Sequence, residues 1–315
     1  TTIGGSSFYF STSVSKKSLL HPEHDRGNNI LLATSASNDH SADSTQIHKP
    51  PTGKRTYNTK SDLYFQKYEK IPLPSIMHDN LERLLSEGKG RANGRHNNRI
   101  LVIGDVHGCL EELQNLVQKA TQDHNNGQKF AAIILVGDLC NKGPSSAETI
   151  AYVRHQPRWF SIRGNHDDRA LAAALGDEEA RSKPKYAWVD ALSDEDVNWM
   201  SELPYTITIP NSMLYTNNAK DVIVVHAGLV PTTDLTNQST HTMVTIRNLI
   251  VEGEPIAWAK LWQGPELVIF GHDAKRGLQK EEHAIGLDSG CVYGNKLTGI
   301  ILPEREYVSS TRKSN

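Results

Sequence analysis

Five short apolar runs in this 315-residue chain are each followed, within three residues, by aspartate, asparagine or histidine. Short apolar runs with turn residues behind them are typical of strands buried on both faces. Helical periodicity separates the first three runs. The pattern therefore predicts an α/β fold with buried sheets. The five runs are Arg99–Ile103, Ala131–Val136, Trp159–Ile162, Val222–Val225 and Leu267–Phe270.

The C-terminal part of the chain continues the strand pattern without helices. Ala284–Leu287 and Leu297–Leu302 have the composition of strands, and no helical period lies between them. Earlier in the chain, Ser145 and Glu148 predict a capping box at the start of a helix. We therefore expect two mixed β-sheets that pack together and are flanked by helices.

The N-terminal part of the chain differs from the rest. Serine and threonine make up 18 of residues 1–60, and apolar periodicity is absent, so we expect a disordered tail. Residues 61–97 are expected to be a linker with a lead-in helix, because Met77, Leu81 and Leu84 fall at helical spacing. The main folded domain is expected over 98–315.

Charge, hydropathy and cysteine content restrict the class of protein. The formal net charge is −2, which gives no global attraction to nucleic acid or membranes, and no apolar run is long enough to span a bilayer. Three cysteines argue for reduced thiols and an intracellular, cytoplasmic protein. Import into an organelle stays open, because no acidic residue precedes Glu23. We expect a monomer.

The polar residues behind the strands form a set of metal-ligand types. A lone Gly-Asp is usually a turn, but the coincidence at five strand ends favours a shared site, because ligands bind outside the carboxyl ends of strands. Carboxylate, amide and imidazole groups together suit Mn, Fe or Zn ions. The set comprises Asp105, His107, Asp138, Asn165, His166, His226 and His272.

The same motifs resemble those of the PPP-type metallophosphoesterases of the calcineurin-like superfamily, over about residues 98–303. The blocks are Gly-Asp-Val-His-Gly (104–108), Gly-Asp (137–138), Gly-Asn-His-Asp (164–167), His-Ala-Gly-Leu (226–229) and Gly-His (271–272). Asn141-Lys142 replaces the Asp-Arg pair of the protein phosphatases and resembles the ApaH-like phosphatases. Residues 268–279 and 286–294 agree with that branch.

This resemblance implies a calcineurin-like sandwich in which 98–315 is the catalytic domain and two divalent metal ions activate a water molecule. One ion is expected to be held by Asp105, His107 and Asp138. The other is expected to be held by Asp138, Asn165, His226 and His272. His166 is the implied proton donor to the leaving oxygen, and Asn141 is its orienting partner.

The uncharged Asn141 bears on the substrate. An amide stabilises an imidazolium less than a carboxylate does, so weak proton donation by His166 favours leaving groups that depart easily. We therefore expect phosphoanhydride substrates: dinucleoside polyphosphates, RNA caps or polyphosphate. A Ser/Thr phosphoprotein phosphatase is the alternative, and an inactive metal-binding scaffold is disfavoured because no expected ligand is missing.

Cations and aromatic residues near the motifs supply candidate substrate contacts. Arg163, Lys142 and Arg247 are expected to bind phosphate oxygens, while a surface position is favoured for Lys275. If RNA caps are substrates, an aromatic side chain should stack on a base. The candidates for that contact are Trp258, Trp262 and Tyr293.

Overall fold

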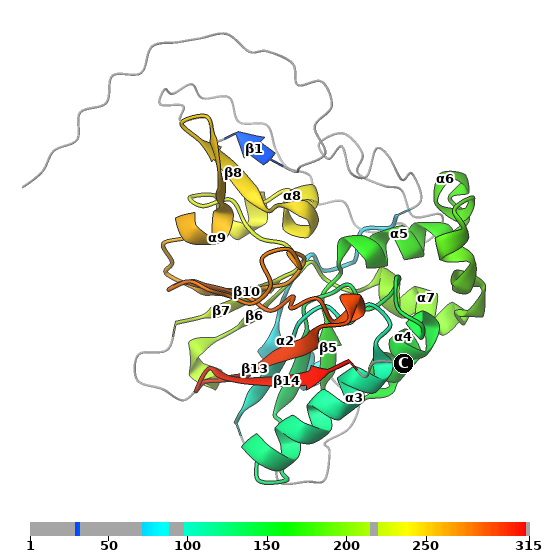
Figure 1. Cartoon of the computed structure of the whole chain (residues 1–315), viewed down its shortest axis with the longest axis horizontal. Coiled ribbons are helices and arrows are strands. Elements are labelled where there is room, and N and C mark those ends of the chain that lie inside the picture. Colours follow the sequence, from blue (N-terminus) through cyan, green and yellow to red (C-terminus); the bar gives the residue numbers. More distant parts are fainter. Residues whose placement is uncertain (1–28, 32–70, 88–97, 215–219, 313–315) are drawn as a thin grey trace, which may run out of the picture.

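The computed structural model describes residues 29–31, 71–87, 98–214 and 220–312. The described residues form a six-stranded sheet, a five-stranded sheet and a small three-stranded sheet, with helices around them (Figure 1). This confirms the predicted α/β fold with two mixed sheets. The predicted tail, 1–60, lies outside the described residues apart from 29–31.

The five-stranded sheet has the order β14-β13-β3-β4-β5. Strands β3, β4 and β5 run parallel, and β13 lies antiparallel to both β3 and β14. The bounds are β3 Ile100–Ile103, β4 Ala132–Leu135, β5 Trp159–Ser161, β13 Lys296–Leu302 and β14 Glu306–Thr311.

The six-stranded sheet has the order β11-β12-β10-β7-β6-β2, and β12, β10 and β7 run parallel. Its bounds are β2 His78–Asn80, β6 Thr206–Ile209, β7 Val222–Val225, β10 Leu267–Phe270, β11 Gln279–Lys280 and β12 Ala284–Gly286. The third sheet joins β1 Asn29–Leu31, β8 Asn248–Val251 and β9 Glu254–Ala257.

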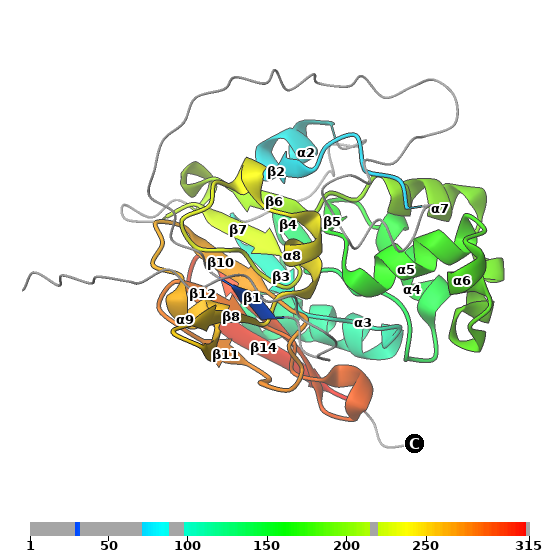
Figure 2. The ribbon, with the colours of Figure 1, turned by 90° about the horizontal axis from the view of Figure 1, so that it is seen from above.

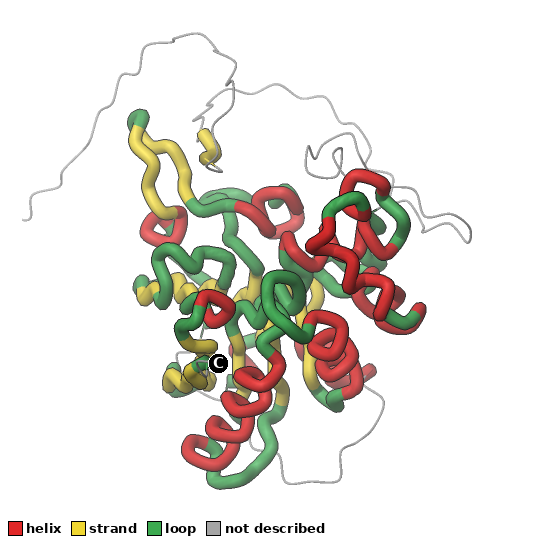
Figure 3. Tube along the Cα trace, turned by 45° about the vertical axis from the view of Figure 1, so that its right-hand side comes forward, coloured by secondary structure: helices red, strands yellow, loops and turns green. Residues whose placement is uncertain are grey.

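The helices surround the two large sheets, whereas the hairpin of β8 and β9 projects outward (Figure 3). Helix α3 packs against β13 and β14, whereas α4 to α7 gather at one side of the sheets (Figure 2). The α-helices are α2 Leu81–Glu87, α3 Leu110–Lys119, α4 Ser146–His155, α5 Asn165–Ala174, α6 Glu178–Arg181, α7 Asp194–Ser201, α8 Thr240–Thr245 and α9 Trp258–Leu261. The described residues also contain a π-helical turn, Ala120–His124, and four 3-10 segments. The 3-10 segments are Pro184–Ala191, Asn211–Met213, Leu235–Asn237 and Cys291–Tyr293.

The core shows why the strands have continuous apolar sequences. Successive side chains of a strand point to opposite faces of its sheet. In β3, Ile100 and Val102 pack with Val224 and Ile269 of the facing sheet, so this cluster lies between the sheets. Leu101 and Ile103 belong to the second cluster, together with apolar residues of α3. Each central strand is therefore buried on both faces.

The predicted linker, 61–97, contains the expected helix and a further element. Helix α2 begins at Leu81, whereas His78–Asn80 form β2, which pairs parallel with β6. Ile71 and Leu81 are fully buried. Residues 71–87 therefore belong to the folded unit, and the rest of this segment lies outside the described residues. The helical spacing of Met77 was misleading, because a period of 3.6 cannot identify a three-residue edge strand beside a helix.

Helix α4 begins after Ser145 as predicted, but the side chain of Ser145 forms no capping hydrogen bond. Nowhere in the described part of the chain is a helix long and apolar enough to cross a membrane.

Candidate metal centre

The two main sheets bring the predicted ligands to one edge. Asp105 and His107 follow β3, and Asp138 follows β4. Asn165 and His166 open helix α5 behind β5, while His226 and His272 follow β7 and β10 of the other sheet. Because these strands end at the same edge, residues far apart in sequence meet where the two sheets join.

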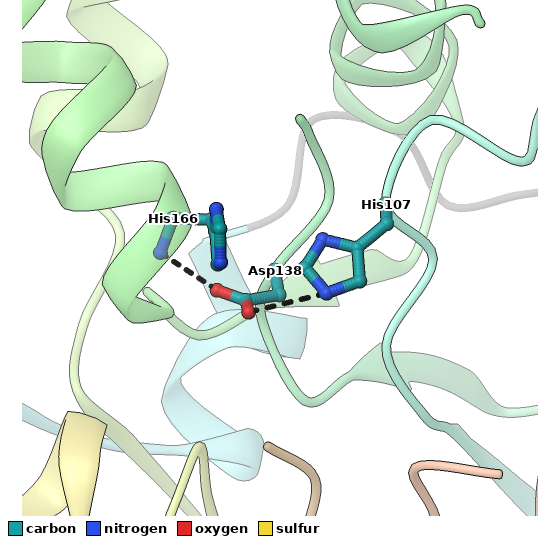
Figure 4. A group of neighbouring side chains, drawn as sticks. All are labelled: His107, Asp138 and His166. Carbon is teal, nitrogen blue, oxygen red and sulfur yellow. Dashed lines mark hydrogen bonds and ion pairs between the residues drawn. The ribbon is translucent and has the colours of Figure 1, made fainter. Parts of the chain in front are cut away.

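Asp138 lies at the centre of this group. One carboxylate oxygen is 3.5 Å from Nε2 of His107, and the other is 3.4 Å from Nε2 of His226. The second oxygen also accepts the backbone N–H of His166 at 2.8 Å (Figure 4). Two groups of possible metal ligands share this one carboxylate: His107 and His166 with Asp138, and His226 and His272 with Asp138.

Hydrogen bonds to backbone carbonyls fix two of the imidazole rings. Nδ1 of His107 is 3.0 Å from the Cys140 carbonyl, and Nδ1 of His226 is 2.9 Å from the Val136 carbonyl. A carbonyl oxygen only accepts, so each Nδ1 carries the proton in the neutral ring and each Nε2 carries a lone pair. Both lone pairs face oxygens of Asp138. Acceptors that face each other in this way are stabilised when a cation lies between them.

The remaining ligands, His272 and Asn165, lie next to His226. Nε2 of His272 is buried and has no hydrogen-bond partner among the described residues. Burial, followed by the charge of His226, holds the pKa of His272 well below its ordinary value. Asn165 Oδ1 lies 3.1 Å from Nε2 of His226. The donor set therefore fits divalent cations, because it presents lone pairs rather than hydrogens.

Three buried carboxyl groups, those of Asp105, Asp138 and Asp288, lie in the centre. Burial, then Asp288 and Asp138, raises the pKa of Asp105 well above its ordinary value. Burial also acts to raise the pKa of Asp138, but the imidazoles around it outweigh that effect and hold the pKa well below its usual range. Asp288 is 5% exposed and, together with His107, Asp138 and His166, lines a cavity at the ligand cluster. Sequence reasoning did not select Asp288, although it lies in the block 286–294 that carries the family resemblance.

The backbone around the ligands is tightly constrained. His107, Asp138 and His272 have φ angles of 48°, 51° and 65°, which β-carbon-bearing residues rarely adopt. A Cβ at Gly164 would overlap Asp138, and a Cβ at Gly271 would overlap the carboxylate of Asp105. These glycines let the loops approach the carboxylates closely, and the surrounding structure maintains the unusual angles.

Asn141 contacts His166, and a tryptophan fixes the direction of its amide. Nε1–H of Trp188 donates to Asn141 Oδ1 at 2.8 Å, so Nδ2 of Asn141 faces His166. That nitrogen lies 3.4 Å from Nδ1 of His166 and donates to the His166 carbonyl at 3.2 Å. Because an indole N–H only donates, this orientation is the one in which the amide also donates toward Nδ1. Burial, outweighing the opposing charge of Asp138, lowers the pKa of His166 to about 3.

Asp167 does not supply the charge that Asn141 lacks. Its carboxylate accepts the backbone N–H groups of Asp138, Leu139 and Gly164 at 2.7, 2.9 and 2.9 Å. It therefore holds the β4 loop against the start of α5. Burial, followed by the charge of Asp138, raises the pKa of Asp167 to about 7.

The predicted cations divide into two groups. Lys142 and Arg247 line the cavity at the ligand cluster, which has a volume of about 480 Å³. Lys275, for which a surface position is favoured, is exposed and lies on the cavity wall as well, as does Arg169, which sequence reasoning missed. Arg163 does not line it, contrary to expectation. Its side chain is fully buried and donates to the carbonyls of Pro72 and Ser201 at 2.8 and 2.6 Å, with Asp168 3.3 Å away.

Lys142 contacts one of the imidazole ligands directly. Its ammonium nitrogen is 3.0 Å from Nε2 of His107, the lone pair that a metal would use. Because Nε2 has a single lone pair, it can face either Lys142 or a metal ion but not both, and Lys142 also lines the cavity at the ligand cluster.

Comparison with known proteins agrees with this geometry. A family model described as calcineurin-like phosphoesterase matches residues 98–297. The chain belongs to the calcineurin-like phosphoesterase family. This confirms the expected family, and membership of this family implies divalent metal ions at the ligand cluster.

Similar members of this phosphoesterase family carry names of the ApaH-like type. The bis(5'-nucleosyl)-tetraphosphatase PrpE (asymmetrical) of Oceanobacillus iheyensis is 32% identical over 232 residues, covering 67% of this chain and 91% of the relative. The protein of the same name from Halalkalibacterium halodurans is 30% identical over 66% of this chain and 92% of the relative. A crystal structure provisionally described as a diadenosine tetraphosphatase is 30% identical, with a TM-score of 0.59 over 76% of this chain and all of that one.

Proposed function

We propose that this phosphoesterase hydrolyses phosphoanhydrides and that dinucleoside polyphosphates are its substrate class. Relatives that are named tetraphosphatases and share more than nine-tenths of their length with this chain support the substrate. The observation that carries the preference for anhydrides is the Trp188–Asn141–His166 arrangement, in which an amide N–H faces the nitrogen of His166.

The proposed cofactor is a pair of divalent ions, Mn, Fe or Zn, on the two sides of Asp138. Asp105 and His107 would hold one ion with Asp138, and Asn165, His226 and His272 would hold the other. Such a pair, when bound, supplies a low-pKa water and neutralises charge on phosphoryl oxygens. The chain's own contribution is to keep the imidazole lone pairs directed inward through the carbonyls of Cys140 and Val136.

His166 is the proposed contact to the leaving oxygen. A fully protonated ring would place Nδ1–H against the donor amide of Asn141, so the imidazolium is disfavoured. His166 then acts through a hydrogen bond from its neutral Nε2–H and transfers a proton poorly. A phosphate leaving from an anhydride departs as a stable anion, whereas a serine alkoxide must gain a proton. The arrangement thus suits anhydrides better than phosphoserine esters.

Cations on the cavity wall would receive that anion. Lys142 lies beside His107, and Arg247 donates to the His272 carbonyl at 3.0 Å, so a cation lies next to each proposed metal position. A chain of several phosphates can then cross the centre with its charge compensated at both ends.

A substrate panel tests the proposal. The full chain, loaded with Mn, is assayed against a dinucleoside tetraphosphate, tripolyphosphate, capped RNA and a phosphoserine peptide. We expect the dinucleotide to have the highest kcat/KM and a chelator to abolish all turnover. A higher kcat/KM for the phosphoserine peptide would instead support a protein phosphatase, and failure on all four substrates would support an inactive scaffold.

A further inference from the structure

Tyr293 is unusually exposed for a large side chain at a buried centre. It is 62% exposed, and it lines the cavity that contains His107, His166 and Asp288. The other large apolar side chain that is exposed in the described residues, Leu175, is 39% exposed and does not line this cavity. A single exposed aromatic residue needs no explanation by itself, so its position relative to the cavity decides its meaning.

The turn that carries Tyr293 is well fixed. Gly290 and Gly294 flank the 3-10 segment Cys291–Tyr293 with φ angles of 74° and 91°. The Tyr293 N–H donates to the Gly290 carbonyl at 3.0 Å, and Cys291 is 2% exposed. The ring therefore projects from an ordered backbone, and a ligand that contacts it does not have to order the turn first.

Lys142 connects the ring to the metal centre. Its ammonium nitrogen lies 5.4 Å from the centroid of the Tyr293 ring and 3.0 Å from Nε2 of His107. The ring centroids of His107 and His166 are 4.9 Å apart. Tyr293 and Lys142 thus lie on the side of the cavity where His166 would meet the leaving group.

The other two candidate aromatics are engaged elsewhere. Trp258 is 1% exposed and donates to the Ala227 carbonyl at 3.0 Å, beneath Gly228. Trp262 is partly buried against the core and donates to the Glu266 carbonyl at 3.1 Å. Neither lines the cavity, so Tyr293 is the one of the three that a ligand at the centre can reach.

We infer that Tyr293 stacks on the nucleobase of the leaving nucleotide, while Lys142 contacts the phosphate of that nucleotide. This inference rests on the proposed function, because it takes a nucleotide as the leaving group. A phosphate at the centre, a cation next to it and an aromatic face beyond the cation follow the order of phosphate and base in a nucleotide. Stacking tolerates any base, so Tyr293 provides selectivity for nucleotides over bare polyphosphate and not for one base.

Equilibrium binding tests the inference without requiring turnover. AMP and ribose 5-phosphate carry the same phosphate and sugar, and only AMP has a base. Calorimetric titration of the Mn-loaded full chain should give a Kd for AMP at least about fivefold lower than that for ribose 5-phosphate, the lower end of the range for one stacked base. In Tyr293→Ala the ratio should fall toward one, while ribose 5-phosphate should bind as before.

Two control variants separate stacking from other effects. Tyr293→Phe keeps the aromatic face and should keep the ratio, and Leu175→Ala removes an exposed apolar side chain outside the cavity and should also keep it. Equal binding of AMP and ribose 5-phosphate by the unaltered chain would overturn the inference, as would an unchanged ratio in Tyr293→Ala. If dinucleotides are not hydrolysed but the AMP preference is present and lost in Tyr293→Ala, the proposed substrate fails and the base site remains.

Discussion

The variant Asn141→Asp tests the link between residue 141 and the leaving group. It replaces a donor amide, 3.4 Å from Nδ1 of His166, with a carboxylate of the same shape. The Trp188 N–H can still donate to the retained oxygen, so the side chain should keep its orientation. The imidazolium of His166 would then face a negative acceptor in place of a donor.

The distance gives the size of the effect. At 3.4 Å and an effective dielectric of about 20, Coulomb's law gives about 5 kcal/mol of attraction, which is an upper limit. Position 141 is 2% exposed, so part of this energy is lost to desolvation of the carboxylate. We expect the pKa of His166 to rise by about 1–3 units, the usual effect of one adjacent opposite charge.

The sign of the pH effect follows from the role of a proton donor. A general acid works when protonated, so turnover falls as the pH rises through its pKa. A higher pKa for His166 therefore moves the alkaline limb of the kcat/KM profile to higher pH. Hydrolysis of a phosphoserine peptide should rise by about tenfold or more, within the usual range of general-acid catalysis, while an anhydride should change little.

The assay compares pH profiles of both substrate classes for the unaltered chain, Asn141→Asp and Trp188→Phe. The Trp188→Phe variant frees the Asn141 amide to turn its oxygen toward Nδ1, so it should change the profile in the same direction by a smaller amount. An equal change for both classes in Asn141→Asp, or an alkaline limb that does not move, would refute the role assigned to residue 141.

Four further changes test other parts of the site. Asp138→Asn should remove metal from both positions, measured by elemental analysis, and lower turnover at least about a hundredfold; normal metal content would exclude a bridging role. Arg163→Met should lower the free energy of unfolding by about 3–5 kcal/mol in a denaturant titration, because it breaks a buried ion pair with Asp168 and removes the donor to the carbonyls of Pro72 and Ser201. Arg247→Met should instead raise KM and leave the free energy of unfolding nearly unchanged. A loss of stability in Arg247→Met, with a raised KM in Arg163→Met, would show that Arg163 binds the substrate and Arg247 supports the fold. A chain that starts at Ser61 should keep its turnover and Tm, since it loses only the three-residue edge strand β1 from the described fold; a large fall in either would contradict this.

The sequence predicts the strands and the ligands for one physical reason. Strands buried on both faces need continuous apolar residues, so the polar residues that follow them are conspicuous in the sequence. Parallel strands end at a common edge, which brings Asp105, Asp138 and Asn165 together without knowledge of any side-chain direction. The expected proximity of these groups therefore follows from topology, and the ligand cluster agrees with it.

Other features depend on side-chain direction, which the local sequence does not specify. Arg163 is next to Gly164 in a ligand-bearing motif, yet its guanidinium turns into the protein toward Pro72 and Ser201. Trp188 comes from a 3-10 segment between α6 and α7, and no pattern around it indicates a contact with Asn141. Both outcomes are decided by packing between segments that are distant in sequence.

Asn141 and Lys142 together suggest how the chain handles the leaving group. A protein phosphatase of the resembling family has an Asp-Arg pair here, which would stabilise a protonated histidine. In this chain the neutral amide faces His166 while the cation of Lys142 lies beside His107. In the proposed reaction, the ammonium group of Lys142, and not a transferred proton, would supply positive charge to the leaving phosphate. Such stabilisation serves an anion that departs with its charge and gives little help to an alkoxide, so the two substitutions favour the same substrate class.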